Sequence, residues 1–269
     1  QSAITLDALI VTAAFDGCLG GYFDSDNDNA WVNAPLNIKF TATTGQVTNR
    51  SNSDVHIELS GGDCAKLIFD STSGLMEISS NEDGSSWQEI EVISGGTLSL
   101  VTEEGDDTQG CDYGLLNCYG ADATVQIYEE AGDNGTPGDI ILIAGTIYTN
   151  SAIDVLTISG GTINHGMDNI EPTEDIDINH IDSYGGSVIW RAAGTLKELI
   201  EHGGNITAVG DGNKQLGDSA DVIELWSGVL NLSGATGMMT LGATCKILFE
   251  GGTLTLPADV DVTWTPQIS

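Results

Sequence analysis

A glycine pair recurs at a fixed place in an alternating pattern of apolar and polar residues along this chain. The pairs are Gly95-Gly96, Gly160-Gly161, Gly185-Gly186, Gly203-Gly204 and Gly251-Gly252, with Ser227-Gly228 in the same register. Two residues after the second glycine stand Leu98, Ile163, Val188, Ile206, Leu230 and Leu254, and two further on stand Leu100, His165, Trp190, Ala208, Leu232 and Leu256. Three residues before it stand Ile93, Ile158, Ser183, Glu201, Leu225 and Phe249.

This pattern predicts a repeating unit of strand, glycine corner and strand, because side chains at every second position of a strand face one side. Glycine allows backbone conformations that a Cβ forbids, and it lets neighbouring coils approach closely. The corners from Gly186 to Gly204, Gly228 and Gly252 are spaced 18, 24 and 24 residues apart. We therefore predict an all-β chain that forms a right-handed parallel β-helix, in which stacked coils align their aliphatic residues into ladders.

The alternative fold is a β-sandwich or barrel of hairpins, which would also give short strands and frequent turns. A corner that keeps its register through six copies favours the solenoid over that alternative. The period fails between Gly96 and Gly161, so two polar stretches, 102–112 and 129–138, are predicted to be loops inserted between coils. The β-helix is expected to span residues 56–269.

Residues 1–55 have no corner motif, and they contain an aromatic and acidic, asparagine-rich stretch. We predict that they form a non-solenoid arm or cap, because the open end of a solenoid exposes unpaired backbone groups and apolar side chains. An ordinary first coil with long loops is the alternative.

The charge of the chain restricts its partners. It has 40 Asp and Glu against 7 Lys and Arg, a formal net charge of −33. Such a surface repels nucleic acid and other copies of itself, so we expect no nucleic-acid partner. The longest apolar stretch, which ends at Ala144, has the length of a strand, so we expect no membrane partner.

The coils Leu156-Thr-Ile-Ser-Gly-Gly-Thr-Ile163 and Ile247-Leu-Phe-Glu-Gly-Gly-Thr-Leu254 resemble those of β-helical virion proteins of tailed bacteriophages. Within that group the chain is most similar to capsid decoration (cement) proteins and to head or tail fibres. The resemblance covers about 152–256 well and 57–100 loosely, while the middle of the chain departs from it. It implies a structural, trimeric protein on a virion surface, with the major capsid protein or other virion subunits as partners.

The sequence offers no pattern typical of a catalytic site. The four histidines have no metal-ligand spacing, and neither a nucleophile elbow nor a phosphate loop occurs. His165 is expected to be a hydrogen-bonded core residue. The seven cations are scattered, so we interpret them as ion pairs on an acidic surface. The leading hypothesis is a non-enzymatic capsid decoration protein. One alternative is a receptor- or glycan-binding fibre or adhesin, which would need exposed aromatic and carboxylate groups along the solenoid. The other alternative is a polysaccharide-degrading β-helix enzyme.

Three further features give candidate sites. Asp24, Asp26 and Asp28 alternate as at the start of a calcium loop, but Asn29 and Pro35 occupy the positions where an EF-hand needs glycine and glutamate. They are therefore a candidate Ca²⁺ site of another kind, with a solvated acidic loop as the alternative.

Trp31 and Trp226 are candidate interface residues, and Trp226 is one because the alternation along its strand places it on the outward side. Of the five cysteines, Cys111 and Cys118 are close enough in sequence to bridge a loop, and Cys64 and Cys245 are expected in the core.

Overall fold

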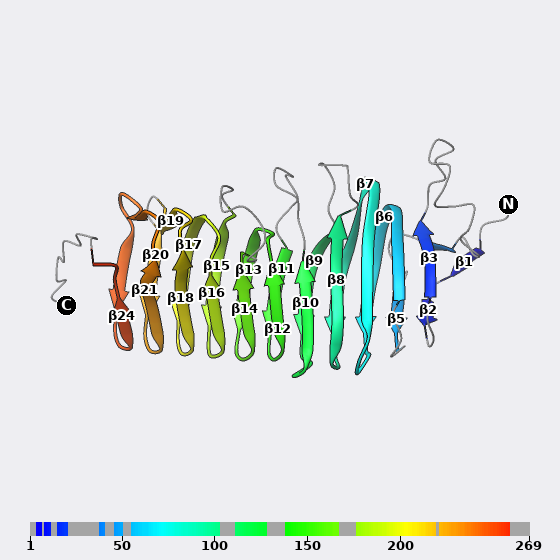
Figure 1. The fold of residues 1–269 in the computed structure, drawn as a ribbon, viewed down its shortest axis with the longest axis horizontal. Helices are drawn as coiled ribbons and strands as arrows, with labels where there is room; N and C mark the ends of the chain where they lie inside the picture. Colours follow the sequence, from blue (N-terminus) through cyan, green and yellow to red (C-terminus); the bar gives the residue numbers. More distant parts are fainter. Residues whose placement is uncertain are drawn as a thin grey trace.

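The chain folds into a long β-solenoid, whose coils follow one another along the rod from the N- to the C-terminus (Figure 1). The computed structural model describes residues 4–6, 8–11, 15–20, 38–40, 46–50, 55–102, 111–127, 138–166, 176–218 and 221–258. All the regular elements of these residues are strands, and the strands pair in parallel. The predicted all-β parallel β-helix is thus confirmed. No helix in this described part is long and apolar enough to cross a membrane.

Two parallel sheets make up most of the rod. Sheet I contains the strands that follow each tight corner: β8 (Gly96–Thr102), β10 (Ala123–Ile127), β12 (Thr146–Thr149), β14 (Thr162–His165), β16 (Ser187–Trp190), β18 (Asn205–Gly210), β21 (Val229–Ala235) and β24 (Thr253–Thr255). Sheet II contains the strands that precede it: β9 (Cys111–Cys118), β11 (Gly138–Leu142), β13 (Ile153–Ile158), β15 (Ile178–Ser183), β17 (Gly194–Glu201), β20 (Val222–Leu225) and β23 (Lys246–Phe249).

The remaining strands extend this plan. β19 (Lys214–Leu216) and β22 (Met239–Leu241) continue from the first residues of β17 as a narrow third ladder. The long strand β7 (Leu75–Val92) pairs with β8 through its first part and with β9 through its second, so it serves both sheets. β6 (Val55–Phe69) pairs with β7 over most of its length.

The segment expected to be a separate arm contains strands of the same kind. These are β1 (Ile4–Leu6), β2 (Ala8–Val11), β3 (Phe15–Gly20), β4 (Ile38–Phe40) and β5 (Gln46–Asn49). β2 pairs in parallel with β5, and β3 pairs in parallel with β6. The described part of residues 1–55 thus continues the parallel pairing of the coils that follow. Corner glycines are not required for this, because backbone pairing alone holds neighbouring rungs together.

The inward ladders occupy the positions that the alternation predicts. Leu230 pairs with Ile206 on one side and Leu254 on the other, as expected. The residues two and four positions after the corner glycines are almost all buried. Most of the residues three positions before the second glycine are also buried, but Ile93 is 44% exposed, because its corner has one residue more than the other diglycine corners and Val92 occupies the inward place. Phe249, in the last described coil, is 46% exposed.

The coils continue between Gly96 and Gly161, although the sequence period is interrupted there. Thr97 pairs with Thr124, Thr124 with Thr146, and Thr146 with Thr162, so each coil keeps its register. The corner before β10 lacks a diglycine, and its turn is closed by the Ala123 amide, which donates to Gly120 O at 3.1 Å. Thr102, Cys111 and Gly138, at the ends of the two predicted loops, belong to strands. Residues 103–110 and 128–137 lie outside the described residues, so the two loop insertions stay predictions.

Candidate binding surfaces

Some of the predicted site residues lie outside the described residues. Asp24, Asp26, Asp28 and Trp31 are among them, so the calcium site and one interface residue stay predictions. Within the described ranges no group of three or more His, Cys, Asp or Glu is placed to hold a metal. Trp226 is 46% exposed, which agrees with its outward parity.

Cys118 is a buried free thiol rather than one half of a bridge to Cys111, and burial raises its pKa to about 11. Cys245 is partly buried against the core.

The solenoid interior holds two buried bases. His165 faces inward as expected, but neither of its ring nitrogens has a hydrogen-bond partner among the described residues, contrary to the prediction. Burial lowers its pKa to about 4, so the ring is neutral at pH 7. Lys214 is not a surface cation, because it is only 2% exposed and donates from Nζ to Arg191 O and Gly212 O, both at 3.0 Å. Burial lowers its pKa to about 8.

The third buried ionisable group is Glu201, which stands in an inward ladder between Ser183 and Leu225. It is fully buried, and neither carboxyl oxygen has a hydrogen-bond partner within the described ranges. Burial raises its pKa to about 7. A Cβ on Gly228 would lie 2.4 Å from Glu201 Oε1, so the carboxyl group lies against the glycine corner. These three groups are enclosed by the solenoid and are not offered to a substrate.

We expect Glu201→Leu to stabilise the protein in a pH-dependent way. A carboxyl group whose folded-state pKa lies above its unfolded value of 4.5 costs stability as the pH rises from there to about 7. The gain of the variant over wild type should therefore grow through this range to about 3 kcal/mol and then stay constant. Denaturant unfolding between pH 4 and 9 measures it. Glu250→Leu, which removes an exposed carboxylate, is the control, and an equal profile for both variants would contradict the prediction.

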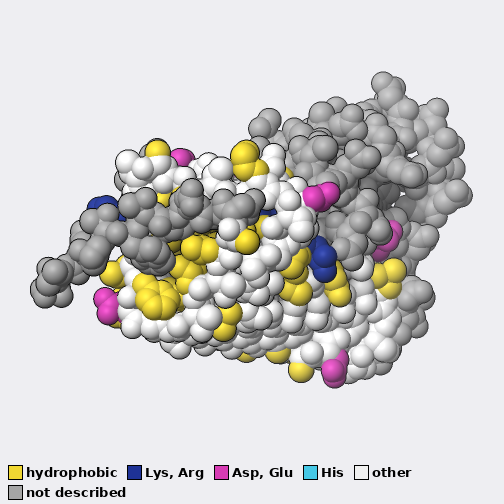
Figure 2. All heavy atoms as spheres, turned by 60° about the vertical axis from the view of Figure 1, so that its left-hand side comes forward, with side chains coloured by type: hydrophobic (Ala, Val, Ile, Leu, Met, Phe, Trp, Pro, Cys, Tyr) yellow, Lys and Arg dark blue, Asp and Glu magenta, His cyan; other side chains and the backbone are white. Residues whose placement is uncertain are grey.

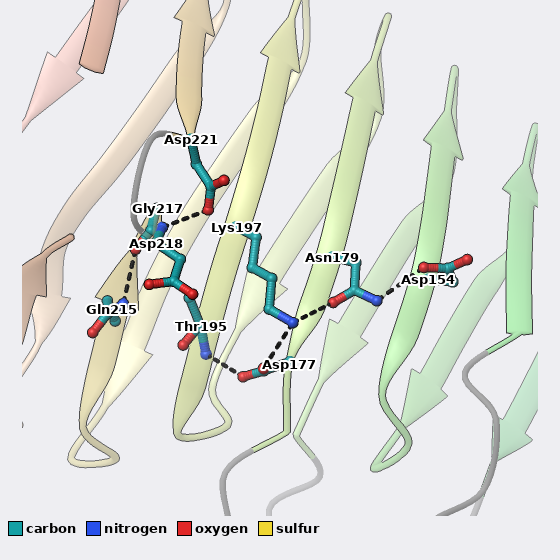
Figure 3. Close-up of polar contacts among 9 residues, drawn as sticks. All are labelled: Asp154, Asp177, Asn179, Thr195, Lys197, Gln215, Gly217, Asp218 and Asp221. Carbon is teal, nitrogen blue, oxygen red and sulfur yellow. Dashed lines mark hydrogen bonds and ion pairs between the residues drawn. The ribbon is translucent and has the colours of Figure 1, made fainter. Parts of the chain in front are cut away.

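A polar row crosses neighbouring coils on the side of the third ladder (Figure 3). Asn179 donates from Nδ2 to Asp154 Oδ1 at 2.9 Å, and Lys197 donates from Nζ to Asn179 Oδ1 at 2.7 Å. Lys197 also lies 3.3 Å from Asp177, whose other oxygen accepts from the Thr195 amide. Each polar group in this row has a partner, which confirms for Lys197 the expected role of a cation that pairs on an acidic surface.

The eight strands of sheet I form an uncharged surface on a strongly acidic protein, and Glu77 of β7 lies beside it where β7 pairs with β8. None of these eight strands contains an Asp, Glu, Lys or Arg, whereas every strand of sheet II contains at least one. The outward positions next to the corner carry short polar side chains in most coils, and form one column: Thr97, Thr124, Thr146, Thr162, Ser187, Asn205, Val229 and Thr253. Since strands in a sheet are about 4.8 Å apart, this neutral surface is about 35 Å long.

The row of tight corners forms a second distinctive surface, which we call the corner edge. The first outward residue of each corner lies on it, and these residues are Ile93, Tyr119, Ile143, Ser159, Tyr184, His202, Trp226 and Glu250. Five of the eight are large apolar side chains that are 42–56% exposed. Hydrophobic side chains are visible along the lower edge in Figure 2, which is the edge of the tight turns in Figure 1.

Three rings on the corner edge stack across successive coils. The ring centroids of Tyr184 and His202 are 5.0 Å apart with 12° between the planes, and those of His202 and Trp226 are 6.3 Å apart with 18°. Trp226 donates from its indole Nε1 to Glu224 Oε2 at 2.9 Å, which fixes the orientation of its ring. Of these three rings, only Trp226 is a predicted interface residue. A usable signal was present, because Tyr184 and His202 also stand two residues before the second corner glycine.

The chain matches no protein-family model, no curated protein and no solved structure.

Proposed function

We propose that this protein is a non-enzymatic structural rod, displayed on the surface of a particle, that associates with copies of itself through sheet I. Its resemblance to β-helical phage proteins favours a virion as the particle and a trimer as the oligomer. On that basis we assign it the role of a capsid decoration or cement protein that stabilises the shell, with the major capsid protein as its second partner.

The neutrality of sheet I is the observation that carries this proposal. Copies of a chain with net charge −33 repel one another, and each carboxylate buried at an interface without a partner adds a desolvation cost. Contact through strands that contain no charged residue avoids that cost. The small side chains of the corner column also allow two sheets to approach closely, and their hydroxyl and amide groups can bond across the interface.

The closed interior supports a non-enzymatic role. The described ionisable groups with the largest pKa shifts, Glu201, His165, Lys214 and Cys118, are buried in the solenoid. Perturbed pKa values mark catalytic groups when they lie in a cleft that a substrate can enter. Buried in ladders, these groups affect the stability of the coils instead.

We expect negative charges on sheet I to dissociate the oligomer. The test variant carries Gln126→Glu, Thr207→Asp and Asn231→Asp, three outward and partly exposed positions of different coils. Sedimentation equilibrium should show an oligomer for wild type and a monomer for the variant. A control variant with Val155→Asp, Thr157→Asp and Val222→Asp adds the same charge to outward positions of sheet II and should remain an oligomer. A monomeric wild type at tens of micromolar, or an unchanged oligomer in the test variant, would refute assembly through sheet I.

A further inference from the structure

We infer that the corner edge is a binding site for an extended, uncharged polysaccharide chain, with the Tyr184–His202–Trp226 stack as its centre. This surface is separate from the strands of sheet I. The proposal therefore adds a ligand to the structural role and does not depend on self-association.

The rings are presented to solvent in a fixed arrangement. Tyr184 is 56% and Trp226 is 46% exposed, although aromatic side chains of this size are usually more deeply buried. Nearly parallel planes with centroids 5.0 and 6.3 Å apart correspond to offset stacking, which leaves part of each ring face uncovered. The bond from Trp226 to Glu224 holds the indole in place before a ligand arrives, which reduces the entropy lost on binding.

This arrangement matches the chemistry of a pyranose ring. One face of such a sugar presents C–H groups that carry partial positive charge, and these are attracted to the negative face of an aromatic ring. Its rim presents hydroxyl groups, which need hydrogen-bond partners at both sides of the stack. Asp182 and Glu224 stand two residues before Tyr184 and Trp226, in strands of sheet II. Their carboxylates thus lie on the sheet II side of the rings, outside sheet I, and can accept hydrogen bonds from sugar hydroxyl groups.

The length and width of the corner edge favour a chain molecule over a protein. Its side chains repeat once per coil, about 4.8 Å, which is close to the length of one pyranose unit in an extended chain. The apolar column is one residue wide, whereas the centre of a protein interface is a broader patch that excludes water. The net charge of −33 disfavours uronic acids and sulfated sugars, so the ligand should be neutral.

The test measures the binding of β-1,4-linked hexamers of glucose, N-acetylglucosamine and mannose by isothermal titration calorimetry, with a galacturonic acid hexamer as the anionic probe. At least one neutral hexamer should bind wild type, and Trp226→Ala should weaken it about tenfold. The Tyr184→Ala, Trp226→Ala double variant should lose measurable binding, while Trp226→Phe retains most of it. Tyr148→Ala is the matched control, because this tyrosine is 37% exposed but lies on sheet I.

Several results would overturn the site: no binding of any neutral hexamer by wild type at millimolar concentration, equal binding by the double variant, or preference for the galacturonic acid hexamer. The sheet I charge variant separates the two proposals, since it should be monomeric and still bind the neutral hexamer. An oligomeric wild type that binds no sugar would refute the glycan site and leave the structural role intact.

Discussion

Leu230→Asp is expected to unfold the C-terminal coils of the solenoid. Leu230 is fully buried, and its ladder neighbours are Ile206 and Leu254. The substitution removes a buried apolar side chain and places a carboxylate among aliphatic groups, with a combined cost of about 5 kcal/mol. Each coil contacts only its neighbours, so the loss should be concentrated in β18, β21 and β24 and the coils around them.

Hydrogen exchange of the backbone amides, together with thermal melting, measures this effect. Amides of the C-terminal coils should exchange much faster than in wild type, while those of β10 and β12 keep their protection. Asn231→Asp is the control, because it puts the same side chain one residue further on, at an outward position, and should change stability by less than about 1 kcal/mol. A Leu230→Asp variant that melts like wild type would show that the inward assignment is wrong.

Gly161→Ala should have the second-largest effect, because two requirements for glycine coincide at this corner. Its φ of +73° lies in the left-handed region, where a Cβ costs about 1–2 kcal/mol. An added Cβ would also lie 2.5 Å from Gly145 O, the corner of the preceding coil. That oxygen is backbone and accepts from the Thr162 amide, so it cannot move without weakening the ladder.

Gly210→Ala separates the two contributions. Gly210 has a similar φ of +82°, but the nearest atom to its Cβ would be Arg191 O at 3.8 Å, an ordinary contact. This variant should therefore lose only the conformational part, about 1 kcal/mol, while Gly161→Ala loses about 3 kcal/mol or more in denaturant unfolding. Equal losses would mean that close approach of the coils adds nothing at the glycine corner.

The glycan site and the structural role are compatible on one rod. Sheet I and the corner edge are different surfaces, so copies joined through sheet I would leave the stacked rings accessible. A polymeric ligand could then contact several copies at once, which raises its overall affinity without new contacts at any single site. Binding of this kind would attach a decorated particle to a carbohydrate-rich surface.

The repeating unit can be predicted from the amino-acid sequence, because that unit depends on local rules. Glycine is required where φ is positive and coils touch, so the corner positions can be recognised in the sequence. The alternation of side chains along a strand separates inward from outward residues. These rules identified the ladder of Leu230 and Leu254, the inward place of His165 and the exposed place of Trp226. They failed at Ile93, where one extra corner residue shifts the parity, and at Phe249, which is exposed in the last described coil.

Which residues become neighbours across coils depends on how the coils stack, because that pairing spans 15 to 40 residues and survives insertions of different length. This stacking carries the register through the middle of the chain, where the sequence pattern is interrupted, and it aligns Tyr184, His202 and Trp226 into one stack. It also buries Glu201 and Lys214, whose charges alone would predict exposure. The physical reason is that a strand position fixes only which way a side chain points, whereas the stacking of whole coils fixes what it meets there.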